Sequence, residues 1–122
     1  MVNVISDTSF LIHFATHRIK NINSIETDIG PLSFIVPEIV KKELVHLSDD
    51  PDKKTISDQT LDFIKNFKTN EIDGSDADSA ILEYIKKNRC IVATMDRELK
   101  NKIKQSGSSI LSIHNDRIIL EN

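Results

Sequence analysis

Short apolar runs alternate along the chain with segments in which apolar residues recur at helical spacing. The runs have the length and the composition of buried strands. The candidate strands are residues 2–6, 33–36, 90–94 and 109–113, with 117–120 as a candidate edge strand. The candidate helices are residues 10–19, 37–47, 56–67, 77–88 and 96–107. Polar breaks with Pro or Gly separate several of them.

Strands separated by helices in this order predict a parallel sheet with helices on both faces. We therefore expect an α/β fold, a three-layer α/β/α sandwich around a central, mainly parallel sheet. A length of 122 residues fits one domain, residues 1–122. In such sheets, ligands bind beyond the carboxyl ends of the strands. Asp7 and Asp96 both follow a candidate strand.

Composition narrows the function classes. No apolar run approaches the roughly 18 residues of a membrane helix, and the first residues do not resemble a signal peptide, so we expect a cytoplasmic protein. Cys90, the only cysteine, lies in the apolar run CIVA and is expected to be a buried residue. A net charge of −3 argues against nucleic-acid binding, unless acidic residues gather divalent cations that reverse the local sign.

Two acidic residues fall on apolar helix faces. Asp78 precedes Ile81 and Leu82 by three and four positions, and Glu43 lies within the apolar stripe of residues 36–47. A carboxylate that faces the core is costly unless it is paired or binds a metal. For Asp78, the alternative is a capping box formed with Ser75. For Glu43, the alternative is a buried salt bridge.

Asp7 and Asp96 also have a simple alternative, because an aspartate before a helix commonly caps it. Together, however, two acids at strand ends and two on apolar helix faces predict a single acidic pocket. Oxygen ligands of this kind suit Mg²⁺ or Mn²⁺. Three hydroxyl residues flank the acids and are candidates for orienting the carboxylates. These supporting residues are Thr8, Ser9 and Thr94.

A histidine pair forms a second candidate metal site. His13 and His17 are four residues apart on a predicted helix, a spacing that can hold zinc. No cysteine or carboxylate stands beside them at a suitable spacing, so two histidines on a helix surface are the commoner explanation.

Four segments resemble the motifs of the PIN-domain ribonucleases, and the resemblance spans nearly the whole chain. The segments are ISDTSFLIH, VPEIVKKELVHL, GSDADSAIL and IVATMDRELKNKI. The resemblance places the family's catalytic and metal-binding acids on Asp7, Glu43, Asp78 and Asp96. Archaeal and small-subunit-processome PIN proteins look most similar. The chain departs from the small-subunit-processome proteins at two positions. Ser79 stands where Asp is frequent, and Met95 stands where Asn is frequent. The missing acid at position 79 weakens a second metal position.

The resemblance implies an Mg²⁺- or Mn²⁺-dependent endonuclease that hydrolyses RNA phosphodiester bonds, with ribosomal-RNA processing as one role. The implied partners are single-stranded or structured RNA and a second copy of the chain, with no membrane. Three alternatives stay open. They are a VapC-type toxin with an antitoxin protein, a PIN-fold nucleic-acid-binding scaffold with weak activity, and a receiver-like phosphate-handling domain. Basic residues cluster at 86–89 and 97–104, where a solvated helix face is the commoner explanation.

Overall fold

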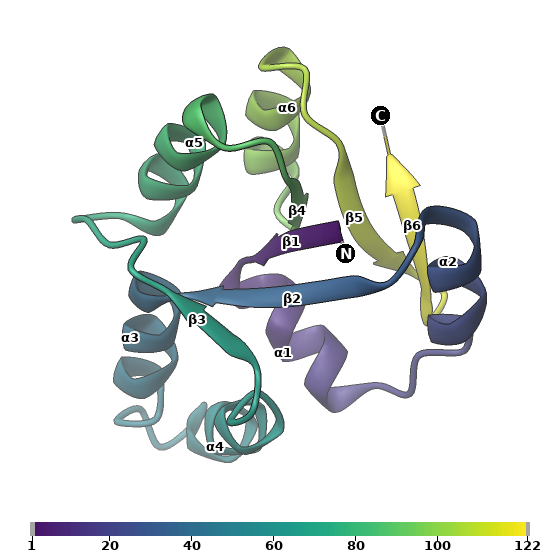
Figure 1. Cartoon of the computed structure of the whole chain (residues 1–122). Coiled ribbons are helices and arrows are strands. Elements are labelled where there is room, and N and C mark those ends of the chain that lie inside the picture. The colour runs from purple at the N-terminus through teal and green to yellow at the C-terminus, as the bar shows by residue number, and fades with distance from the viewer. Residues whose placement is uncertain (1, 122) are drawn as a thin grey trace.

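A six-stranded sheet runs through the centre of the computed structural model, which describes residues 2–121 apart from the side chain of Thr27 (Figure 1). The strands are β1 (Val2–Ser6), β2 (Leu32–Pro37), β3 (Lys68–Asn70), β4 (Ile91–Ala93), β5 (Ile110–His114) and β6 (Arg117–Glu121). Their order is β3-β2-β1-β4-β5-β6. All neighbouring pairs are parallel except the β5–β6 hairpin.

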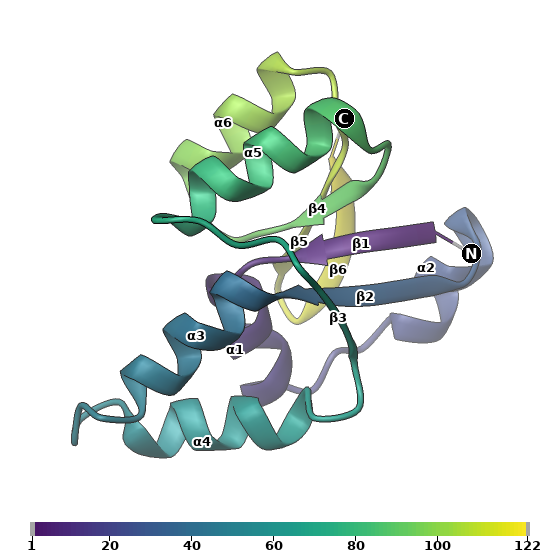
Figure 2. The same cartoon turned by 60° about the vertical axis from the view of Figure 1, so that its left-hand side comes forward.

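Helices cover both faces of this sheet. They are α1 (Thr8–Thr16), α2 (Ile22–Ile29), α3 (Glu38–Leu47), α4 (Lys54–Phe63), α5 (Ala77–Lys87) and α6 (Arg97–Gln105). Figure 2 shows α5 and α6 on one side of the strands, with α1, α3 and α4 on the other. The predicted three-layer α/β/α sandwich with a mainly parallel sheet is thereby confirmed.

The core consists of separate clusters on the two faces of the sheet. Successive side chains of a strand point to opposite faces. Val4 accordingly packs with Phe10 of α1, while Ile5 packs with Ile81 of α5 and Leu99 of α6. Both strand residues are fully buried, so β1 is the centre of the core. Among residues 2–121, no helix is both long enough and apolar enough to cross a bilayer.

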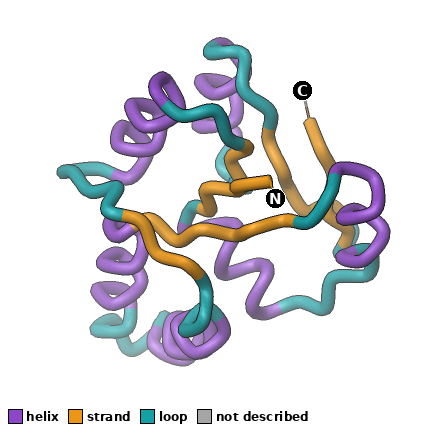
Figure 3. The backbone as a smooth tube through the Cα atoms, viewed as in Figure 1, coloured by secondary structure: helices purple, strands orange, loops and turns teal. Residues whose placement is uncertain are grey.

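Two elements were missed by the sequence pattern. The helix α2 has no side-chain hydrogen bond at its N-cap, and β3 is a three-residue polar strand at the edge of the sheet. The other predicted elements are present with small shifts of their ends. Pro37, expected in the first helical turn, ends β2 with an extended backbone and precedes α3. The loop between β3 and α5 projects from the molecule in Figure 3.

All five phenylalanines pack against one another. Phe14 is central, with ring centroids 5.5 Å from Phe10, 5.1 Å from Phe34 and 5.2 Å from Phe63. Phe67 lies 5.5 Å from Phe63 and closes the group. The cluster joins α1 and α4 to β2, so its rings contribute to the packing of the fold, and Phe63 also stays partly exposed.

A partly exposed network of hydrogen bonds and ion pairs ties the last strand to α6. The carboxylate of Glu121 accepts hydrogen bonds from Ser112 at 2.5 Å and from Lys100 and Lys104 at 3.1 Å. The bond from Ser112, with smaller contributions from the two lysines, outweighs burial and lowers the pKa of Glu121 to about 2. The basic face of α6 is therefore partly neutralised within the fold.

Replacing Glu121 should destabilise the protein in a pH-dependent way. Because its pKa is lower in the folded state than its ordinary value of 4.5, the charge stabilises the fold above that pH, and this stabilisation is lost toward pH 2. We expect Glu121→Gln to lower the free energy of unfolding by about 1–2 kcal/mol near neutral pH. Urea unfolding at several pH values measures this, with the exposed Glu71→Gln as control. An equal loss at pH 3 and pH 7 would contradict the charge-based explanation.

Candidate active site

The two acids predicted at strand ends lie at the turning point of the sheet. The chain builds β2 and β3 on one side of β1 and then crosses to β4 on the other side, which makes the end of β1 a topological switch point. Asp7 directly follows β1, and Asp96 follows β4 after two residues. Because β1 and β4 are parallel neighbours, their carboxyl ends meet at the same edge.

Asp7 is the most enclosed of the four acids, with 6% of its surface exposed. Its Oδ1 accepts hydrogen bonds from the Phe10 amide at 2.9 Å and from the Ser9 hydroxyl at 2.8 Å, and its Oδ2 accepts one from the Thr94 hydroxyl. Burial is the main reason that the pKa of Asp7 is raised, against the effect of these bonds, and Asp78 adds to the rise. Three hydrogen bonds therefore hold the carboxylate of Asp7 in a place where burial disfavours its charged form.

Two hydroxyls connect the ends of β1 and β4. The Thr94 hydroxyl donates to Asp7 and accepts the Asp96 amide at 3.0 Å. The Ser9 hydroxyl donates to Asp7 and accepts the Met95 amide at 3.1 Å. Both residues were predicted to orient carboxylates, and in the structure each donates a hydrogen bond to Asp7.

Asp96 and Asp76 cap the helices that follow them. The Asp96 Oδ1 accepts the Leu99 amide at 3.1 Å at the start of α6. The capping box of Ser75 and Asp78, considered as the alternative for Asp78, does not form, because Asp76 is the N-cap of α5 and accepts both the amide and the hydroxyl of Ser79. The sequence interpretation did not consider Asp76, the first of the two neighbouring aspartates, as the cap. Asp78 is therefore free of a capping role and lies in the first turn of α5.

Glu43 reaches the same region from α3. Its Oε2 accepts a hydrogen bond from the Thr8 hydroxyl at 2.5 Å, across 35 residues of sequence. Among residues 2–121, it forms no ion pair with a lysine or an arginine. The buried salt bridge considered for Glu43 is thus not present, and Thr8 holds the carboxylate at the site.

The four predicted acids line one cavity of about 300 Å³. The residues around it are Asp7, Thr8, Ser9, Ile12, Glu43, Ala77, Asp78 and Asp96. Burial first, then the charges of Asp96 and Asp76, raise the pKa of Asp78. Lys102 opposes this effect from outside the cavity. Like charges therefore gather here without a basic side chain among the lining residues.

This donor set fits a hard divalent cation. Every charged group that lines the cavity is a carboxylate, and such oxygens are the ligands that Mg²⁺ and Mn²⁺ prefer. In the described part of the chain, no three of the four acids bring their oxygens within 4.8 Å of one another. The cavity is thus wider than a closed cage for one ion, and it leaves room for water or a phosphate group among the ligands.

Comparison with known proteins identifies the family. The sequence model described as a PIN-like domain matches residues 4–116. The chain belongs to the PIN-domain family. This PIN domain is 32% identical to ribonuclease VapC4 of Methanocaldococcus jannaschii, with 93% of the chain and 91% of the relative covered. It is 26% identical to ribonuclease VapC9 of Archaeoglobus fulgidus, with 91% and 82% covered.

Solved structures give the same result for the fold. The PIN domain endonuclease Utp24 superposes with a TM-score of 0.76 at 25% identity, with 95% of this PIN domain and 90% of that chain covered. A domain of a functionally unknown protein from M. jannaschii superposes with a TM-score of 0.64 at 18% identity, with 93% and 92% covered. Membership of the PIN family excludes the receiver-like alternative.

Cys90, which was expected to be buried, is partly buried. This burial raises the pKa of its thiol to about 11, which disfavours a catalytic thiolate.

Removing one acid should stabilise the metal-free PIN domain. Asp78 is pushed toward its neutral form by burial and by neighbouring acids, so Asp78→Asn relieves repulsion in the folded state. We expect the free energy of unfolding in EDTA to rise by about 0.5–2 kcal/mol near neutral pH, the range typical of relieved active-site residues. Urea unfolding measures the change, and added Mg²⁺ should stabilise the original protein more than the variant. A variant that is less stable in EDTA would argue against crowded charge at this cavity.

Proposed function

We propose that this PIN domain is an Mg²⁺- or Mn²⁺-dependent endoribonuclease that hydrolyses RNA to products with a 5′ phosphate and a 3′ hydroxyl. The observation that carries the proposal is the meeting of Asp7, Glu43, Asp78 and Asp96 in one cavity at the switch point of the sheet. Two sequence relatives are named ribonucleases, and a structural neighbour is described as an endonuclease.

The four carboxylates would hold the metal. When bound, such ions lower the pKa of an attacking water and stabilise the charge that develops on the leaving oxygen. The protein's own contribution is positioning. Thr94 and Ser9 fix Asp7, while Thr8 fixes Glu43. Asp76 does not line the cavity and its carboxylate accepts a hydrogen bond from Ser79. It is therefore a poor substitute for the Asp that the processing nucleases commonly have at the position of Ser79.

Recognition of RNA would rely on the backbone more than on the bases. Lys100 and Lys104 form ion pairs with Glu121, and Lys86 Nζ lies 3.6 Å from Glu83 Oε2. The charges of these three lysines are therefore partly neutralised. Lys102 is exposed and lies close enough to Asp78 to affect its pKa, so it could meet a phosphate at the cavity. The phenylalanines pack with one another, which argues against stacking of bases on them.

Two variants with matched chemistry test this proposal. Asp96 and Asp76 are both exposed N-caps, and asparagine caps helices as well as aspartate does. Only Asp96 lines the cavity. We expect Asp96→Asn to reduce cleavage of end-labelled single-stranded RNA in Mn²⁺ by about 100-fold or more, and Asp76→Asn to change it little.

The same assay separates the endonuclease from a binding scaffold. Internal fragments with 5′ phosphates support an endonuclease, and EDTA should abolish them. Equal cleavage by both variants would reject the assigned site. RNA binding without cleavage by the original protein, in Mg²⁺ and in Mn²⁺, would favour the scaffold alternative.

A toxin role is the second candidate, because both sequence relatives carry the name VapC. An antitoxin partner and a homodimer stay predictions from the family resemblance. We expect induced expression in a bacterial host to arrest growth, and expression of Asp96→Asn not to do so. Normal growth at equal soluble yield of an active enzyme would favour ribosomal-RNA processing or another specific target over a toxin.

A further inference from the structure

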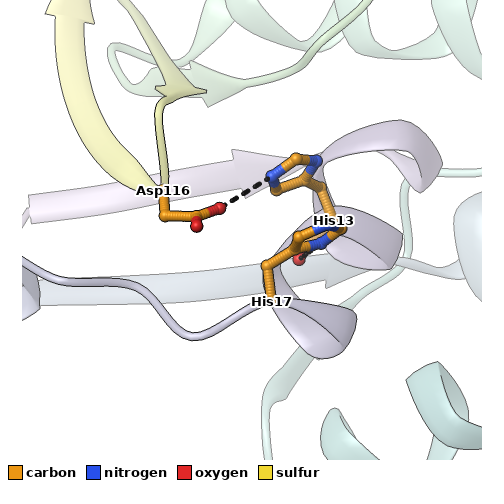
Figure 4. Close-up of side chains that lie close together, drawn as sticks. All are labelled: His13, His17 and Asp116. Atoms are coloured by element: carbon orange, nitrogen blue, oxygen red, sulfur yellow. Dashed lines mark hydrogen bonds and ion pairs between the residues drawn. The ribbon is translucent and has the colours of Figure 1, made fainter.

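A carboxylate completes the histidine pair at the far end of α1. His13 and His17 are one helical turn apart, and the fold brings Asp116 to them from the β5–β6 hairpin (Figure 4). One potential ligand atom from each residue lies within 4.8 Å of the others. The sequence shows no such carboxylate because about 100 positions separate it from the pair. Along α1, at a rise of 1.5 Å per residue, His13 lies about 9 Å and His17 about 15 Å from Asp7.

The hairpin turn fixes the position of Asp116. Asn115 and Asp116 have φ values of 52° and 59°, as in the tight two-residue turn that favours Asn and Asp. The carbonyl of Asp116 accepts the Lys20 amide at 2.8 Å. One residue further, the Asn21 side chain exchanges hydrogen bonds with both backbone groups of Ile118, at 2.7 and 2.8 Å. The carboxylate is therefore anchored to the loop that follows the two histidines.

Hydrogen bonds select the tautomer of His17. Its Nδ1 lies 3.2 Å from the carbonyl of His13 and 3.0 Å from the hydroxyl of Thr16. That hydroxyl donates its own proton to the Ile12 carbonyl at 2.7 Å, so both neighbours of Nδ1 act as acceptors. Nδ1 then carries the proton, and Nε2 keeps a free lone pair. A backbone partner on one ring nitrogen is the usual support of a metal-binding histidine.

His13 presents a nitrogen without a hydrogen-bond partner. Its Nε2 is buried and, among the described residues, makes no hydrogen bond. The Oδ1 of Asp116 lies 3.8 Å from this nitrogen. The rings of His13 and His17 stack with centroids 3.9 Å apart and planes 10° apart. The contact of 3.8 Å between His13 Nε2 and Asp116 Oδ1 is too long for a hydrogen bond, so an ion pair alone leaves this buried nitrogen unsatisfied.

We propose that His13, His17 and Asp116 form a binding site for Zn²⁺ that fastens the β5–β6 hairpin to the end of α1. Two imidazoles and a carboxylate are a familiar zinc ligand set, with the fourth position open to solvent. Bond lengths of about 2.0–2.2 Å require ligand atoms roughly 3.3–3.6 Å apart. The nitrogen lone pairs lie in the ring planes, so zinc binding would turn the two imidazoles out of their nearly parallel stack. This nitrogen-containing site differs in chemistry from the all-carboxylate cavity, and it does not depend on the proposed nuclease function.

Zinc binding to the untagged full chain tests the proposal. Calorimetry with Zn²⁺ in excess Mg²⁺ reports sites that Mg²⁺ does not fill, and Co²⁺ absorption reports tetrahedral nitrogen and oxygen coordination. His17→Ala removes an exposed side chain, and Asp116→Asn keeps a residue that tolerates the turn. His46→Ala is the matched control, as an exposed histidine on another helix. Asp96→Asn controls for binding at the acidic cavity.

We expect one zinc per chain, with affinity at least tenfold lower in His17→Ala and in Asp116→Asn, because losing even an outer partner of a metal ligand costs about 10–100-fold. Zinc should raise the melting temperature of the original protein, of His46→Ala and of Asp96→Asn, but not of the two ligand variants. No zinc binding in excess Mg²⁺ would overturn the proposal. Binding that is lost in Asp96→Asn or in His46→Ala, but kept in His17→Ala, would overturn it as well.

Discussion

The hydrogen bonds around the buried carboxylate of Asp7 are the constraint on which the site depends. A carboxylate at the end of a central strand is tolerated only when its oxygens are satisfied. Ser9 and Phe10 supply donors from the next turn of the chain, and Thr94 supplies one from the neighbouring strand end. Since Thr94 also accepts the Asp96 amide, the partner that satisfies one acid positions a second.

The N-termini of three helices help to stabilise the negative charge at the cavity. Helices α1, α5 and α6 begin beside the cavity, and the positive ends of their dipoles favour anionic groups there. Asp7 and Asp96 serve as N-caps and as cavity residues at the same time. Asp78 lies in the first turn of α5 but caps no helix, and burial and the neighbouring acids raise the pKa of its carboxyl. Structural and chemical roles thus coincide at Asp7 and Asp96, whereas Asp78 has no capping role.

The sequence predicted what depends on local pattern. Apolar periodicity located the main strands and helices, and the polarity of their faces singled out Glu43 and Asp78. The polar edge strand β3 has no such pattern. In α2, Ile22, Ile25 and Ile29 do recur at helical spacing, and this short pattern was overlooked. Contacts between distant segments were also out of reach. The partner of Glu43 is 35 residues away, and the carboxylate beside His13 is on the last hairpin. Such pairs follow from topology, which local spacing does not encode.

The side chain of Asn21 also has a consequence for association between molecules. By bonding to both the amide and the carbonyl of Ile118, it mimics a neighbouring strand at the outer edge of β6. An open sheet edge is a template on which other chains can add strands and aggregate. At the opposite edge, β3 is only three residues long and begins with a lysine. Growth of the sheet by strand addition is therefore disfavoured at both ends, which leaves side-chain surfaces as the route for copies of this chain to associate.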